Sequence, residues 1–177
     1  MTRIDTAVAG AYILDVTPIP DDRGFFAEAF RHDTFERLGL STRIAQVNIS
    51  YNDHAHTLRG MHYQRAPHAE VKVVRCVRGA VYDVAVDLRP DSPTFGRWAA
   101  VELTADNRRA FYVPEGCAHG YQTLTDNTEV HYLVSTTYAP SHYEGVRWND
   151  PFFNVTWPDA PQRHMHARDL TYPDFRP

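Results

Sequence analysis

The chain has 177 residues, of which 43% are hydrophobic and 23% charged, and its formal net charge is −4. This length fits one domain over residues 1–177, and the negative balance argues against a nucleic-acid-binding surface. No apolar run reaches about 18 residues, so we expect no membrane span. The first residues read as mature sequence and not as a signal peptide. We therefore expect a cytoplasmic protein in which Cys76 and Cys117 are reduced and buried.

One short helix is predicted early in the chain. Asp33 is positioned to cap it, residues 34–38 follow, and Gly39 ends it. Runs of β type come next, separated by turn signals, and beyond Pro158 the sequence is irregular with a helical turn over 166–170. Such closely spaced strands are typical of an all-β sandwich or barrel. The clearest runs are 71–77, 80–88, 99–103, 110–113 and 129–136.

Polar residues interrupt the expected strands at Lys72, Asp83 and His131. A barrel with a polar interior that holds one ligand would explain them, and so would the solvent-facing side of a sandwich. Lys72 is the only lysine among 18 basic residues. A guanidinium does not replace a compact ammonium, so a single retained lysine indicates a specific need, or else chance.

Three residue types suited to proton transfer lie in strand-like stretches. Arg59 and His62 are three residues apart, His119 follows a turn, and Tyr132 lies within a strand. A histidine base, a nearby cation and a tyrosine acid suit proton transfer at a carbon beside a carbonyl. Taken singly, a barrel histidine is more often a hydrogen-bonded structural residue, and Tyr132 a core residue.

Ten histidines also raise the question of a metal site. The pairs His54/His56 and His164/His166 have the His-x-His form. Both lie in polar, turn-like stretches with no carboxylate at a supporting spacing, so a metal site is the weaker interpretation. Cys117 shows no feature of an activated nucleophile, and no glycine-rich phosphate loop is present.

Several motifs, in order, resemble the dTDP-4-dehydrorhamnose 3,5-epimerases of the cupin superfamily, from about Gly10 to Asp169. One such match would be weak, but the full set in the family's order is a strong signal. The matching stretches are DRGFFAE (22–28), LRGMHYQ (58–64), VYDVAVDLR (81–89), SPTFG (92–96), PEGCAHG (114–120) and WNDP (148–151).

The cupin resemblance also bears on metals. In metal-binding cupins a glutamate ligand occupies the position that Lys72 holds here, whereas Gly79 and His119 fit the rest of the pattern. An ammonium repels a cation, so the resemblance implies no metal and no cofactor. It also implies that Lys72 stands inside the barrel.

The resemblance implies a fold, a substrate and a mechanism. The fold is a cupin-type jelly-roll β-barrel, and the substrate is a nucleotide-diphosphate sugar with a ketone at C4. His62 matches the base, Asp169 its paired carboxylate and Tyr132 the acid on the opposite face. Lys72 would stabilise the enolate oxygen. The family is homodimeric, and its N-terminal strand contributes to the partner's sheet and site.

Other positions match residues that contact substrate in this family. Tyr138 matches an aromatic residue that stacks on the nucleoside base, and Asp83 matches a carboxylate that holds His119. The substrate-binding positions are Arg23, Phe26, Glu28, Gln46, Asn48, Arg59, His119, Tyr138, Glu144 and Arg168.

The chain also departs from the usual family pattern, for example at Val47, Cys117, Leu133 and Arg168. A mono-epimerase acting at C3 or C5 alone, or an epimerase of another nucleotide sugar, therefore stays open. A non-catalytic or metal-dependent cupin is the alternative from another class.

Overall fold

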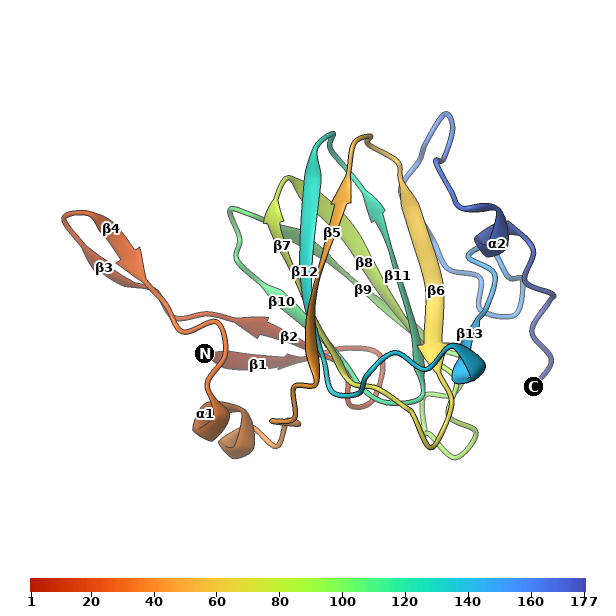
Figure 1. Ribbon diagram of the computed structural model, residues 1–177, viewed down its shortest axis with the longest axis horizontal. Helices are drawn as coiled ribbons and strands as arrows, with labels where there is room; N and C mark the ends of the chain where they lie inside the picture. The colour runs from red at the N-terminus through yellow and green to blue at the C-terminus, as the bar shows by residue number, and fades with distance from the viewer.

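Two antiparallel sheets face each other and form the body of the molecule (Figure 1). The computed structural model describes residues 1–177. The six-stranded sheet has the order β1 (Thr2–Asp5), β2 (Tyr12–Asp15), β10 (Ala110–Val113), β7 (Lys72–Arg78), β12 (Thr128–Val134) and β5 (Gln46–Asn52). The five-stranded sheet has the order β13 (Tyr143–Gly145), β6 (Leu58–Gln64), β11 (Cys117–Thr123), β8 (Ala80–Asp87) and β9 (Trp98–Thr104). The all-β expectation is confirmed.

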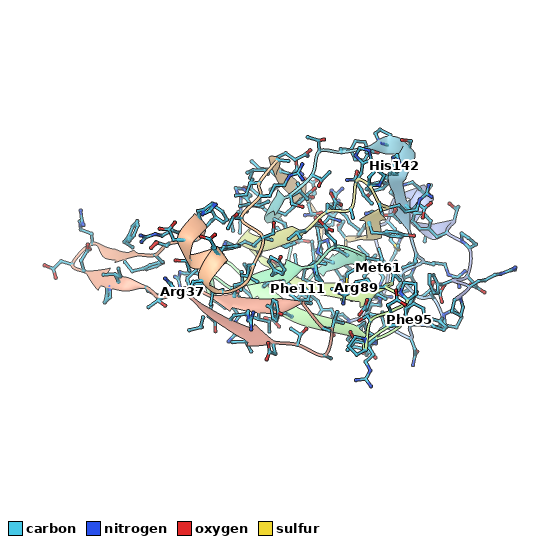
Figure 2. All side chains as sticks on the ribbon, turned by 90° about the horizontal axis from the view of Figure 1, so that it is seen from below. Arg37, Met61, Arg89, Phe95, Phe111 and His142 are labelled. Atoms are coloured by element: carbon cyan, nitrogen blue, oxygen red, sulfur yellow. The ribbon has the colours of Figure 1, made fainter.

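Strand β8 illustrates how the sequence builds the core. Val81 and Ala85 point between the sheets and belong to the central cluster that includes Phe111, which lies inside the body in Figure 2. The alternate residues Val84 and Val86 pack on the outer face of the five-stranded sheet. Both faces of β8 are therefore buried, which explains its nearly continuous apolar sequence.

The outer faces of both sheets are covered by segments from the two ends of the chain. Phe153 and Trp157, from the C-terminal segment, pack over the five-stranded sheet. Phe35 of helix α1 (His32–Arg37) and Leu40 pack over the six-stranded sheet. A short 3-10 helix, η1, spans Pro140–His142, and helix α2 spans Ala167–Leu170, where a helical turn was expected.

Helix α1 differs from the prediction at its start. Asp33 is not the cap, because the helix begins at His32 and the capping position is Arg31, which makes no side-chain capping bond. Its end is as predicted: Gly39 has φ +71°, a left-handed conformation, and follows the last turn. The N–H of Leu40 returns to the carbonyl of Phe35 at 2.9 Å, which completes a Schellman-type ending.

Strands β3 (Ile19–Asp21) and β4 (Gly24–Phe26) form a separate hairpin that projects from the body (Figure 1). Its apolar residues Ile19 and Phe26 are 62% and 64% exposed. The ring of Phe25 lies 4.4 Å from the Arg108 guanidinium of the body, but Ile19 and Phe26 stay exposed, and an isolated two-stranded hairpin is at best marginally stable in water.

The polar strand residues separate into two groups. Lys72 and Asp83 are buried between the sheets, as a barrel with a polar interior requires. His131 does not join them. Residues 130 and 132 take the inward positions of β12, so His131 is half-exposed on the outer face. There its Nε2 lies 2.7 Å from Glu129 Oε1. No helix in the structure has the length and apolarity needed to cross a membrane.

Candidate active site

A cavity of about 540 Å³ receives side chains from both sheets. Strands β5, β7 and β12 supply one wall, and β6 and β11 supply the opposite wall. The segment 164–169, together with Tyr138 and Tyr143, completes the lining. A cavity of this size suits a small-molecule ligand.

A bulge in β6 brings Arg59 and His62 to the same face of the strand. Residues three apart normally point to opposite faces, but the β6–β11 register shifts between the pairs His62–His119 and Arg59–Tyr121. Gly60 sits at this shift with φ +132°, and a Cβ there would lie 2.5 Å from the Cα of Gly120. The bulge therefore requires glycine, and it aims both functional side chains into the cavity.

The bulge also anchors the partner of His62. The N–H of Gly60 donates to Asp169 Oδ2 at 3.2 Å, and His62 Nε2 lies 2.8 Å from Asp169 Oδ1. The pair expected between His62 and Asp169 is confirmed. A carboxylate only accepts hydrogen bonds, so Nε2 carries the proton and Nδ1 is the basic nitrogen.

Burial and charge set the protonation states of this pair. Desolvation lowers the pKa of His62, and the positive charges of Lys72 and Arg168 lower it further, although Asp169 opposes them. Burial would raise the pKa of Asp169, but its contacts with His62, the Gly60 N–H and Arg168 outweigh burial and lower it. The site therefore holds a neutral imidazole beside an ionised carboxylate near neutral pH.

Backbone pairing fixes the segment that carries Asp169. The N–H of Leu58 donates to the carbonyl of His164 at 2.9 Å, which ties the segment to the start of β6. The side chain of His166 then accepts from the N–H of Arg168 and caps α2. This short helix directs Asp169 inward, while the Arg168 guanidinium lies over the ring of Tyr143, 4.9 Å from its centroid.

Lys72 stands inside the barrel, as predicted, and its side chain is 9% exposed. Its ammonium lies 2.7 Å from Glu70 Oε1 and donates to the carbonyl of His62 at 3.3 Å. The chain's single lysine thus contacts the backbone of His62 and a buried carboxylate that sequence reasoning missed.

Tyr132 reaches the cavity from the wall opposite His62. In the β7–β12 ladder Tyr132 pairs with Val74 and Lys72 pairs with Val134, so Tyr132 and Lys72 are diagonal neighbours on one face. Burial raises the pKa of Tyr132; Arg59 opposes this shift and Glu70 adds to it. The phenol therefore keeps its proton and can donate it.

The contact expected between Asp83 and His119 is confirmed, with Asp83 Oδ1 lying 2.5 Å from His119 Nε2. Asp83 is fully buried, and burial raises its pKa even though His119 and Lys72 oppose that shift. Its second oxygen, Oδ2, has no hydrogen-bond partner. This carboxylate orients His119 at the inner end of the site.

Most of the predicted binding residues line the cavity, and four do not. Arg23 and Phe26 lie on the projecting hairpin, where Arg23 pairs with Asp21, and the half-buried Glu28 pairs with Arg31. Both oxygens of Glu144 are engaged by Tyr63 and Arg65, away from the cavity. The predicted binding residues in the lining are Gln46, Asn48, Arg59, His119, Tyr138 and Arg168.

Strand alternation was the signal for some residues that sequence reasoning missed. Ser50 continues the inward set of Gln46 and Asn48, and Glu70 lies two positions before Lys72. Tyr121, 2.7 Å from Ser50, lies two positions after His119 on β11 and faces inward by the same alternation. The remaining unforeseen lining residues are Thr57, Leu58, Val134, Tyr143, His164, Met165 and His166.

The histidine pairs and the cysteines were weighed as alternative chemistry. The rings of His54 and His164 lie 4.9 Å apart, but no three His, Cys, Asp or Glu side chains converge as metal ligands. Burial raises the pKa of Cys76 to about 11 and that of Cys117 to about 12. Neither thiol has the depressed pKa of a nucleophile.

Comparison with known proteins gives a family-level match over nearly the whole chain. The model of the family described as dTDP-4-dehydrorhamnose 3,5-epimerase matches residues 5–177. The Salmonella typhimurium protein named dTDP-4-dehydrorhamnose 3,5-epimerase is 41% identical over 174 residues, which cover 98% of this chain and 94% of the relative.

Solved structures agree with the sequence match. The Bacillus anthracis dTDP-4-dehydrorhamnose 3,5-epimerase, crystallised with TDP and PPi, has a TM-score of 0.93 and 40% identity over 98% of this chain and 99% of that one. ChmJ, a 3'-monoepimerase from Streptomyces bikiniensis in complex with dTDP-quinovose, has a TM-score of 0.87 and 37% identity. Its match covers 94% of this chain and 84% of that one. The fold alone does not separate double from single epimerases.

Proposed function

The chain belongs to the dTDP-4-dehydrorhamnose 3,5-epimerase family, and we propose that His62 and Tyr132 are the base and the acid of its reaction. The protein is an isomerase that acts at C3 and C5 of a dTDP-linked 4-keto-6-deoxyhexose in deoxysugar biosynthesis.

One observation carries the assignment: His62 and Tyr132 line one cavity from different sheets. His62 lies on β6 of the five-stranded sheet, and Tyr132 lies on β12 of the six-stranded sheet. Inverting a carbon centre requires a proton to leave one face of the ring and another to arrive on the opposite face. Side chains on facing walls meet that requirement, whereas two neighbours on one strand would not.

The proposed step begins with proton abstraction by His62. The C–H bond at C3 or C5 breaks, its electron pair forms a carbon–carbon double bond to C4, and the ketone becomes an enolate with negative charge on O4. The ammonium of Lys72 stabilises that oxygen in a site largely shielded from water. Asp169 holds the imidazole tautomer and stabilises the imidazolium that forms.

Protonation from the other side completes the inversion. The Tyr132 O–H donates its proton to the carbon, and the electron pair returns to restore the C4 ketone. His62 is then protonated and Tyr132 is a phenolate, so exchange with solvent resets both groups before the second carbon reacts. The shifts described above suit this cycle, because His62 begins neutral and Tyr132 begins protonated.

The diphosphate and the nucleoside are assigned to the outer part of the cavity. Arg59 and Arg168 supply guanidinium groups suited to phosphate oxygens. Asn52 accepts from Arg59 Nε at 2.7 Å, which fixes the direction of that side chain. Tyr138 is 56% exposed at the cavity and offers a ring face to the base of the nucleotide.

We further propose that residues 1–177 form one domain, and that the protein is a cytoplasmic homodimer in which the β3–β4 hairpin reaches the partner. The hairpin exposes the apolar side chains of Ile19 and Phe26. The edge strand β5 is exposed at Val47 and Ile49, which are 61% and 66% accessible. In such a dimer Arg23, Phe26 and Glu28 would contribute to the partner's site, which explains why they lie outside the cavity of their own chain.

Solvent-deuterium incorporation into a dTDP-4-keto-6-deoxyhexose tests the catalytic roles. Wild-type protein should label both C3 and C5, His62→Ala should abolish labelling, and Tyr132→Phe should retain some exchange but lose inversion. Label at one carbon only would indicate the mono-epimerase alternative, which the similarity to ChmJ keeps in view. Normal exchange in His62→Ala would refute the base assignment.

A further inference from the structure

Glu70 is a buried carboxylate in the cavity that has no role in the mechanism so far. Its side chain is 9% exposed, as is that of Lys72, and the two form an ion pair at 2.7 Å. Glu70 lies two residues before Lys72, the first residue of β7, and its side chain reaches the same side of the chain as that of Lys72. A charged pair this well shielded is retained at a cost in desolvation, which points to a specific use.

The donors of Lys72 indicate what that use is. An ammonium has three N–H groups. One is directed at Glu70, and a second reaches the carbonyl of His62 at 3.3 Å. With two donors fixed, the third is left for a ligand in the cavity, beside the base.

Asp83 is a second carboxylate that could accept a hydrogen bond from the ammonium of Lys72. Asp83 lies deeper in the barrel, its Oδ2 is buried without a hydrogen-bond partner, and its ionisation responds to the charge of Lys72. A lysine that lacked Glu70 would have a second carboxylate to approach. Glu70 therefore decides where the ammonium points.

We propose that Glu70 is a positioning residue, which holds the ammonium of Lys72 toward the sugar O4 and away from Asp83. This inference rests on the proposed function, because it presumes that Lys72 stabilises the enolate. Glu70 is not itself expected to touch the reacting atoms.

The charge of Glu70 also affects the pKa of Tyr132, the proposed acid. The charged and titratable groups that share the cavity with Tyr132 on these strands are Arg59 and His62 from β6, His119 and Tyr121 from β11, and Lys72 and Glu70 from the β7 side. Glu70 adds to the increase in the Tyr132 pKa that burial begins. Removing its charge lowers that pKa, so the phenol loses its proton at lower pH and the alkaline limb of the rate profile moves down in pH.

The test is Glu70→Gln, which keeps the shape and an acceptor oxygen but removes the charge. Exchange at C3 and C5, KM, the pH profile and the melting temperature are measured. We expect kcat for exchange to fall about tenfold, as when a charge-assisted hydrogen bond becomes neutral, with KM changed less than about twofold. The alkaline limb should move to lower pH. Glu129→Gln is the matched control, because Glu129 pairs with His131 on the outer face, and it should behave as wild type.

A folded Glu70→Gln protein with wild-type kcat and an unmoved alkaline limb would overturn the proposal. If this variant does not fold, Glu70→Asp decides, because it keeps the charge and shortens the reach. A lowered kcat with an unmoved alkaline limb would then support positioning, and an unchanged kcat would contradict it. His62→Ala in the same assay reports on the proposed function, so failure of one inference is distinguishable from failure of the other.

Discussion

Replacing Asp169 by asparagine tests the proposed role of His62 as the base, because the change keeps the shape of the Asp169 side chain and removes its charge. One carboxylate oxygen faces His62 Nε2 at 2.8 Å, and the other accepts from the Gly60 N–H at 3.2 Å. An amide cannot satisfy both partners. Its NH2 group must face either the backbone N–H, which is also a donor, or the imidazole, which would then have to adopt the other tautomer.

The magnitude follows from the lost charge-assisted hydrogen bond. Such a bond contributes about 1.5–3 kcal/mol, and about 1.4 kcal/mol corresponds to a factor of ten in rate. We therefore expect exchange at C3 and C5 to slow by roughly 10- to 150-fold in Asp169→Asn.

The substitution should also shift the pH dependence of exchange in a definite direction. Burial lowers the pKa of His62. The positive charges of Lys72 and Arg168 lower the His62 pKa further, and among these charges only that of Asp169 raises it. Without Asp169 the pKa of His62 falls further, so the base stays neutral to lower pH. The acid limb of exchange should move to lower pH even as the plateau rate drops.

Deuterium exchange followed by NMR across the acid limb measures both effects in one series. Asp174→Asn is the control, because Asp174 is 62% exposed and pairs with Arg147 away from the cavity. A rate within about threefold of wild type, which is under 1 kcal/mol, or an acid limb displaced to higher pH would refute the reasoning about His62.

Three further predictions concern the cation, the bulge and the edge strand. Lys72→Arg keeps the positive charge but should slow exchange about 100-fold, because the larger planar guanidinium cannot replace a compact donor at one oxygen. Exchange near the wild-type rate would contradict this prediction. Gly60→Ala should lower the free energy of unfolding by about 3 kcal/mol in urea titrations, because its Cβ would meet the Gly120 backbone at 2.5 Å; an unchanged unfolding midpoint would argue against the clash. Ile49→Asp on β5 should give a monomer in sedimentation equilibrium with the fold intact; an unchanged dimer would exclude β5 from the interface.

Strands with strong local signals could be predicted from the sequence. Residues 110–113 are strand β10 with the expected bounds, and β8 ends one residue short of its predicted run. Turn residues and β-branched runs act over a few residues, so they mark such elements well. The cap of α1 was predicted wrongly. The extended backbone of Arg31 places the N-cap there, two residues before Asp33, and the sequence does not reveal this backbone conformation.

The site depends more on tertiary structure than the strands do. His62 and Asp169 were paired through the resemblance, since nothing local relates residues 107 positions apart. The reason that Arg59 and His62 share a face is the register shift opposite Gly120, a property of two strands together. Glu70 lies two residues before Lys72, so its proximity to that lysine was predictable, but the sequence does not show that both side chains are buried and form an ion pair.

In the proposed mechanism, the two-wall arrangement also accounts for how one base and one acid can serve two carbons. In a gluco-configured 4-keto ring, the hydrogens on C3 and C5 are both axial and on the same face. With O4 held by Lys72, the two carbons flank the anchored oxygen, so a small pivot of the ring about O4 brings either hydrogen toward the wall that carries His62. Tyr132 on the other wall then faces whichever carbon has reacted. A second catalytic pair is unnecessary, and the difference between single and double epimerisation is expected to lie in how long the ring is held between the two events. We propose that contacts outside the His62–Tyr132 pair set that residence, chiefly those assigned to Arg59, Arg168 and Tyr138 with the nucleotide.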